Sequence, residues 1–122
     1  MKRIIAVLGV VILLSGCKNY HNYDNKEHYI IAVDENVSIY YTTNSCCYPC
    51  VVNQIELKHL NLIDNKTISK ESEECAGCNY IGELIFKGNS IGIDTIELKI
   101  LSMNMRCDSN EIVADKYIVE IK

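Results

Sequence analysis

The chain has 122 residues, 48% of them hydrophobic, and carries 16 acidic against 12 basic residues, for a formal net charge of −4. This length is typical of one domain, and the acidic excess argues against electrostatic binding to nucleic acid or to anionic lipid head groups. It is compatible with a basic protein partner.

The first sixteen residues have the layout of a secretory signal peptide. Lys2 and Arg3 precede an apolar run over residues 4–14, and the small residues Ser15 and Gly16 follow it. The run is too short to remain as a membrane-spanning helix, so we expect it to be cleaved. Cleavage would leave ten basic against sixteen acidic residues and make the mature chain more acidic.

Leu14-Ser15-Gly16-Cys17 resembles the lipobox of bacterial lipoproteins, in which the cysteine is acylated and becomes the first mature residue. Its thiolate accepts a diacylglyceryl group, and small flanking residues let the membrane enzymes reach it. We therefore predict a lipoprotein signal peptide over residues 1–16 and lipid attachment at Cys17. Two or three acyl chains there would hold the protein stably on a bilayer. The alternative is a secreted protein in which Cys17 is incidental.

Residues 17–28 are polar, rich in asparagine and charge, and show no apolar period. They predict a lipidated tether ahead of a domain over residues 29–122. At roughly 3.3 Å per residue, the stretch from Lys18 to His28 reaches at most about 36 Å. Lys18 is not the aspartate that retains enteric lipoproteins at the inner membrane. The resemblance therefore implies the cell envelope, at the periplasmic face of an outer membrane.

Alternation of apolar and polar residues with β-branched and aromatic side chains predicts a series of short strands. The strands are expected at 29–33, 37–42, 81–87, 95–103 and 117–121, with weaker ones at 67–69 and 91–93. Polar and glycine-containing stretches predict turns at 34–36, 64–66, 88–89 and 108–110. The turn at 34–36 is short, so the first two strands are expected to form a hairpin.

The stretch between the second strand and residue 63 is harder to assign. Residues 43–50 contain the only proline and are expected to be a loop. Residues 51–63 favour a strand with a bulge near Lys58 and His59, where the apolar phase slips. A helix over the same residues is the competing interpretation. About seven short strands without a long helical period predict an all-β fold: a small, disulfide-stapled, immunoglobulin-like β-sandwich.

Six cysteines remain if Cys17 carries lipid, and an even number in an exported chain predicts a disulfide framework. The candidates are Cys46, Cys47, Cys50, Cys75, Cys78 and Cys107. They permit fifteen pairings, and we expect the neighbours Cys46 and Cys47 not to pair with each other, because their ring would be strained. A bridge from 46–50 to Cys75 or Cys78 would stabilise the fold by roughly 3–4 kcal/mol. Cys107 would reach one of the same clusters and staple the loops at one end.

Two chemical alternatives use the paired cysteines. Cys47-Tyr48-Pro49-Cys50 resembles the thioredoxin-type motif of thiol-disulfide oxidoreductases. Those folds also carry a second proline, in the cis form, facing the motif, and Pro49 has no companion. Together with Cys75 and Cys78, the motif also resembles a zinc ribbon, although an oxidising compartment disfavours free thiolates.

No other sequence motif indicates catalysis. His21, His28 and His59 lack ligand-like or triad-like neighbours, and no phosphate-binding glycine loop is present. We therefore expect a non-enzymatic protein without a cofactor.

As a whole, the lipobox at residues 14–17 and the all-β pattern from Tyr29 onward resemble small periplasmic lipoproteins that serve as immunity proteins of type VI secretion systems. The resemblance implies a membrane-anchored protein-binding module that neutralises a toxin effector by covering its active site or surface. Its partners would be the bilayer, through acylated Cys17, and a protein.

Overall fold

The computed structural model describes residues 23–44, 46–70 and 79–122. The predicted signal peptide, Cys17, Cys75 and Cys78 lie outside these ranges. Within them, no helix is both long and apolar enough to cross a membrane.

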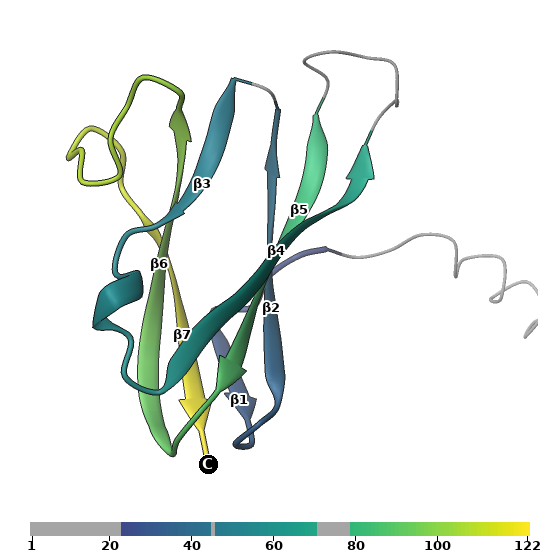
Figure 1. Ribbon diagram of the computed structural model, residues 1–122, viewed down its shortest axis with the longest axis vertical. Coiled ribbons are helices and arrows are strands. Elements are labelled where there is room, and N and C mark those ends of the chain that lie inside the picture. The colour runs from purple at the N-terminus through teal and green to yellow at the C-terminus, as the bar shows by residue number, and fades with distance from the viewer. Residues whose placement is uncertain (1–22, 45, 71–78) are drawn as a thin grey trace, which may run out of the picture.

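The described chain forms seven strands in two facing sheets (Figure 1). One sheet has the order β1-β7-β6-β3 and the other β2-β5-β4; β1 runs parallel to β7, and the other pairs are antiparallel. The elements are β1 (His28–Ile31), β2 (Asn36–Thr43), β3 (Cys47–Val51), the 3-10 helix η2 (Gln54–Glu56), β4 (Leu60–Lys70), β5 (Tyr80–Gly88), β6 (Gly92–Ser102) and β7 (Asp115–Ile121). The prediction of an all-β, immunoglobulin-like sandwich is confirmed.

The core lies between the two sheets and follows the alternation seen in the sequence. Ile39 and Phe86 from one sheet are fully buried, as are Ile96 and Val119 from the other. Successive side chains of a strand point to opposite faces, so the alternating residues between them face outward. The predicted strands at 81–87 and 117–121 match β5 and β7, and those at 91–93 and 95–103 are one continuous strand, β6.

The predicted hairpin of the first two strands is wrong. β1 pairs with β7, and β2 pairs with β5 in the opposite sheet. A tight turn with Asp34 at φ 75° and a hydrogen bond from the N–H of Glu35 to the carbonyl of Ala32 carries the chain across. Because the chain crosses between the sheets, β1 and β2 both bury an apolar face in the same core. Alternation in the sequence shows that a segment is a strand, but not which strand it pairs with.

The predicted loop over 43–50 is also wrong, because Cys47–Val51 forms β3. Pro49 cannot donate a hydrogen bond to a ladder, and this usually excludes proline from a central strand. β3 is the edge of its sheet and pairs only with β6, so the missing N–H costs no ladder bond on the outer side.

The strand expected over 51–63 is replaced by the end of β3, the short helix η2 and the start of β4. Ile55 lies on η2 and is 96% exposed, so neither a strand face nor a helix face is buried there. The predicted turn at 64–66 is part of β4, which contains bulges at Leu62/Asp64 and Thr67/Ser69. β4 is an edge strand, so polar residues that usually mark a turn can remain solvated within it.

Candidate functional site

The cysteines that the structure describes gather at one end of the sandwich. Cys46 lies in the turn before β3, Cys47 and Cys50 lie within β3, and Cys107 lies in the long connection from β6 to β7. We call this connection, residues 103–114, the strap. In Figure 1 the strap lies at the same end of the molecule as the β2–β3 turn.

Two disulfides join these residues. Cys50 is bonded to Cys107 across 57 positions of sequence, with their Cα atoms 5.9 Å apart. Cys46 is bonded to Cys47, which contradicts the expectation that neighbours would not pair. Adjacent side chains point to opposite faces in a regular strand, but Cys46 belongs to the turn before β3, so this rule does not apply to the pair. The expected bridges to Cys75 and Cys78 involve residues outside the described ranges.

The strap covers the outer face of the sheet next to β3. In the β3–β6 register Cys50 lies opposite Lys99, and Tyr48 lies opposite Leu101. Lys99 and Leu101 alternate with the core residue Leu98 along β6, so their side chains point away from the core. Their partners Cys50 and Tyr48 in β3 lie on the same outer face. Leu101 is nevertheless 0% exposed, so it is covered on this outer face, where the strap is bonded to Tyr48 and Lys99. The sheet therefore has a small second apolar contact on its outer side.

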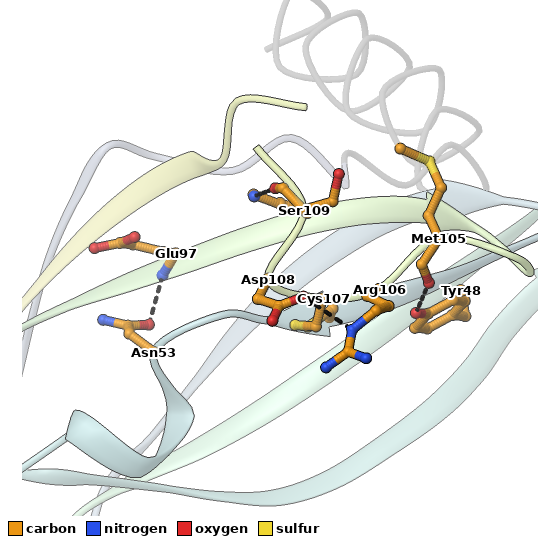
Figure 2. The surroundings of a disulfide bond; sticks show 10 residues. Tyr48, Asn53, Glu97, Met105, Arg106, Cys107, Asp108 and Ser109 are labelled. Carbon is orange, nitrogen blue, oxygen red and sulfur yellow. Dashed lines mark hydrogen bonds and ion pairs between the residues drawn. A yellow bond between two sulfur atoms is a disulfide. The ribbon is translucent and has the colours of Figure 1, made fainter. Parts of the chain in front are cut away.

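Contacts from the covered face hold the part of the strap that ends at Ser109 (Figure 2). The Tyr48 hydroxyl donates to the carbonyl of Met105 at 2.7 Å. Lys99 as a whole is only 9% exposed, and its ammonium group donates a hydrogen bond to the carbonyl of Ser109. With the disulfide at Cys107 between these two points, the strap is fixed at three successive positions.

The strap is also ordered by its own contacts and by the neighbouring turn. The N–H of Met103 donates to the carbonyl of Cys46 at 3.0 Å, which ties the start of the strap to the β2–β3 turn. The N–H of Ser109 donates to the carbonyl of Arg106 at 3.0 Å, and Arg106 pairs with Asp108 at 3.3 Å. These contacts give the strap a defined conformation before any partner binds.

Two large apolar side chains on this preorganised connection face solvent. Met103 is 70% exposed and Val113 is 88% exposed. Loops held by a rigid scaffold often carry binding residues, and exposed apolar groups on such a loop can add contact area to a partner. Preorganisation lowers the entropy lost on binding, so such a surface can bind a partner tightly.

The geometry does not favour redox or metal chemistry. Cys47 and Cys50 are three positions apart in β3 and point to opposite faces, and each is bonded to a different cysteine. A thioredoxin-type motif needs the pair together at a helix N-terminus. Within the described part of the chain, no three His, Cys, Asp or Glu side chains gather as a metal site.

The described histidines make structural contacts. His28 lies 3.9 Å from Glu120, and Nδ1 of His59 lies 2.8 Å from the hydroxyl of Ser90. The ring of His59 lies against the backbone of Gly92, where a Cβ atom would be only 2.3 Å from Nε2. Neither histidine belongs to the strap.

The sequence did not reveal that Tyr48 and Lys99 hold the strap, or that Leu101 is buried on the outer face. One signal was present. The apolar residues Ile100 and Leu101 are adjacent near the end of β6, and two consecutive apolar residues in a strand indicate that both faces are covered. Nothing in the sequence indicates that a carbonyl of the strap accepts a hydrogen bond from Lys99.

Comparisons with known proteins show similarity in fold only. No family model matches the chain, and no curated protein matches it in sequence. Among solved structures, the cysteine protease inhibitor EhICP2 from Entamoeba histolytica has a similar fold, with a TM-score of 0.58. The two chains are 16% identical, and the similarity covers 78% of this chain and 86% of that chain.

Proposed function

We propose that the protein is a non-enzymatic inhibitor that binds a partner enzyme through the strap and the adjoining β2–β3 turn. The observation that carries the proposal is a long connection held rigid by one disulfide and two side-chain hydrogen bonds, with Met103 and Val113 exposed on it. The similar fold of a cysteine protease inhibitor supports a protein partner such as a protease.

The proposed inhibitor acts by occlusion. An apolar projection that is already ordered can enter or cover the partner's active-site cleft at a small cost in entropy. The acidic net charge of −4 favours a partner with a basic surface around that cleft.

The proposed location is the bacterial cell envelope, with the chain anchored by acyl groups on Cys17. In that setting the finer form of the proposal is an immunity lipoprotein that neutralises a toxin effector of a type VI secretion system. The lipobox at residues 14–17 supports the anchor. Mass spectrometry of protein taken from its native membrane tests it: a lipid-modified Cys17 is expected, and an unmodified Cys17 in the mature protein would contradict it.

Site-specific photocrosslinking tests the proposed contact surface. A photoreactive amino acid replaces Val113 in one variant and Ile55, which is 96% exposed on η2, in a matched control. Only the Val113 variant is expected to crosslink to the partner in the native envelope. The captured protein is then assayed with added wild-type protein, alongside a papain-type cysteine protease as a first probe. A captured enzyme that keeps full activity would refute inhibition.

A further inference from the structure

A second binding feature lies on the free edge of β2, apart from the strap. β2 pairs only with β5, so one side of its backbone faces away from the sheet. At Tyr40 this side is covered by Asn25, whose side-chain amide accepts a hydrogen bond from the Tyr40 N–H and donates one to its carbonyl, each at 2.8 Å. Asn25 thus takes the place of a neighbouring strand at one position.

The contact of Asn25 identifies which backbone groups of β2 point outward. In an antiparallel pair, the N–H and C=O of one residue point to the same side, and this side alternates along the strand. The β2–β5 register is regular over its whole length, so Thr42 presents its N–H and C=O to the same edge as Tyr40. No other described residue forms a hydrogen bond with these two groups of Thr42.

A cavity of about 280 Å³ adjoins this edge. Its aliphatic lining comes from Ile81, Leu98 and Ile100, and its aromatic lining includes Tyr41 and Tyr117. The volume is close to the lower end of the range for ligand pockets and suits one long side chain.

The charge at this cavity is negative. Among the described residues that line it, Asp115, the first residue of β7, is the carboxylate, and none is Lys, Arg or His. Lys116 follows Asp115 and points to the opposite face of the strand. Aromatic rings near a carboxylate favour a cation both by charge and by cation–π attraction.

The other edges of the described sheets are less suited to pairing. β4 is interrupted by two bulges, β3 contains Pro49, and β1 has four residues. Bulges, proline and short length all hinder the addition of another strand. The edge of β2 at Thr42 is regular, and it borders the cavity described above.

We propose that the edge of β2 at Thr42 binds an extended peptide segment of a protein partner, with a lysine or arginine side chain of that segment in the tyrosine-lined cavity beside Asp115. The backbone of the segment pairs with Thr42, as in other complexes formed by strand addition, and the cavity selects the side chain. This site shares no residue with the strap, so it stands whether or not the protein inhibits an enzyme.

Three blocked pentapeptides test the proposal, with binding to the purified, oxidised protein followed by NMR. The first is acetyl-Val-Lys-Val-Lys-Val-amide, the second carries Glu in place of both Lys, and the third is the Lys peptide with an N-methylated central Val. The Lys peptide is expected to bind about tenfold more tightly than the Glu peptide and to shift the amide signals of residues 40–43. The N-methylated peptide, which lacks a ladder donor, is expected to lose about tenfold in affinity.

Variants of the protein separate the two parts of the site. Asp115→Asn is expected to weaken the Lys peptide about fivefold and leave the Glu peptide unaffected or improved. Thr42→Pro removes the outward N–H without breaking a bond to β5 and is expected to weaken both peptides. Asp64→Asn, on the opposite edge strand β4, is the matched control and should change nothing.

Several results would overturn the proposal. They are equal affinity for the Lys and Glu peptides, full binding by the N-methylated peptide, unchanged binding by Asp115→Asn, and no binding at about 1 mM peptide. N-acetyl-lysine-N-methylamide is a control that carries the same ammonium group without an extended peptide backbone. If it binds as tightly as the Lys peptide, the cavity recognises an amine alone and strand addition is refuted.

Discussion

At the scale of single residues, Asp94 is the buried carboxylate that fixes the start of β4 to β6. It accepts hydrogen bonds from the backbone N–H groups of Lys58, His59 and Leu60, at 3.2, 2.7 and 3.0 Å. These three amides lie between η2 and the first residue of β4, where the chain passes from one sheet to the other. One side chain therefore replaces the ladder bonds that this segment lacks.

Replacement of Asp94 by alanine is expected to lower the free energy of unfolding by about 3 kcal/mol, because three donors lose a charged acceptor in a mostly buried site. Denaturant unfolding measures this loss. Asp64→Ala, at an exposed position of β4, is the control and should change stability by no more than about 0.5 kcal/mol. A loss below about 1 kcal/mol for the Asp94 variant would show that water replaces the carboxylate.

Tyr41 crosses the inner face of the smaller sheet to reach the far strand. Its ring lies over Gly82 of β5, where a Cβ atom would be 2.1 Å from Cζ, and its hydroxyl donates to Oδ1 of Asn65 on β4 at 2.6 Å. Gly82 thus provides the space that the ring occupies. Burial raises the pKa of Tyr41 above its usual value of 10.0, Tyr80 raises it further, and the bond to Asn65 opposes the shift.

This pKa shift predicts how stability depends on alkaline pH. A group whose pKa is raised in the folded state binds its proton more tightly there, so its stabilising contribution is complete below the unfolded pKa of about 10 and is lost as pH rises through the folded pKa. The free energy of unfolding should therefore fall above about pH 10. Tyr41→Phe should make this decrease shallower in denaturant titrations between about pH 8 and 11. An identical pH profile in the variant would contradict the assignment.

At the scale of elements, the edge of β2 depends on Asn25. Its side chain pairs with the backbone of Tyr40 and also donates to the hydroxyl of Tyr117 at 3.3 Å. Edge strands that lack such cover tend to pair with other chains. The segment ahead of β1 therefore protects β2 although it is not itself a strand.

Asn25→Ala is expected to lower stability by about 1 kcal/mol and to speed hydrogen exchange at the amide of Tyr40. Asn61→Ala, at an exposed position of β4, is the matched control. If the exchange rate of the Tyr40 amide is the same in both variants, Asn25 does not cover that edge.

The strap depends on the disulfide between Cys50 and Cys107. On the chain-entropy model, a bridge across 57 positions stabilises the folded state by about 4 kcal/mol. The double variant Cys50→Ala/Cys107→Ala should lose about this much in denaturant unfolding and should exchange the amides of residues 103–114 faster. Cys46→Ser/Cys47→Ser, which opens only a ring of neighbours, should lose about 1 kcal/mol on the same model. Equal losses in the two variants would contradict the assigned role.

The sequence predicted the strands better than it predicted their partners. Alternation identified β2, β5, β6 and β7 because each has one face in the core. Alternation failed at Pro49 and at 64–66, because residues that usually mark turns lie there in edge strands. It also failed at the first hairpin, because packing of the whole core decides which sheet each strand joins. The disulfide between the adjacent residues Cys46 and Cys47 was not predicted, because the sequence did not show that Cys46 lies in a turn.

The candidate site was predicted only in part. The cysteine pattern indicated that loops would be stapled at one end, and the structure joins Cys50 to Cys107 there. The supporting contacts of Tyr48 and Lys99 with the strap depend on register between strands that are 50 positions apart in sequence. Alternation shows which residues share a face, whereas the pairing of these strands is decided by packing across the whole core.

At the scale of the whole molecule, the connections between strands gather at two opposite ends of the sandwich. The strap and the β2–β3 turn lie at one end, and the β1–β2 and β5–β6 turns lie with the C-terminus at the other (Figure 1). A rigid scaffold that holds a loop with exposed apolar residues at one end suits the proposed binding of a partner there.

The most direct test of the proposed inhibition is a titration of the enzyme that crosslinks at Val113. Wild-type protein is expected to abolish its activity at a one-to-one ratio, and Val113→Arg is expected to weaken inhibition about tenfold or more, because a charge replaces an apolar contact. Ile55→Arg, on the exposed helix η2, is expected to inhibit as well as wild type does. Inhibition that is equally strong in the Val113 variant, or an enzyme that wild-type protein leaves active, would contradict the central claim.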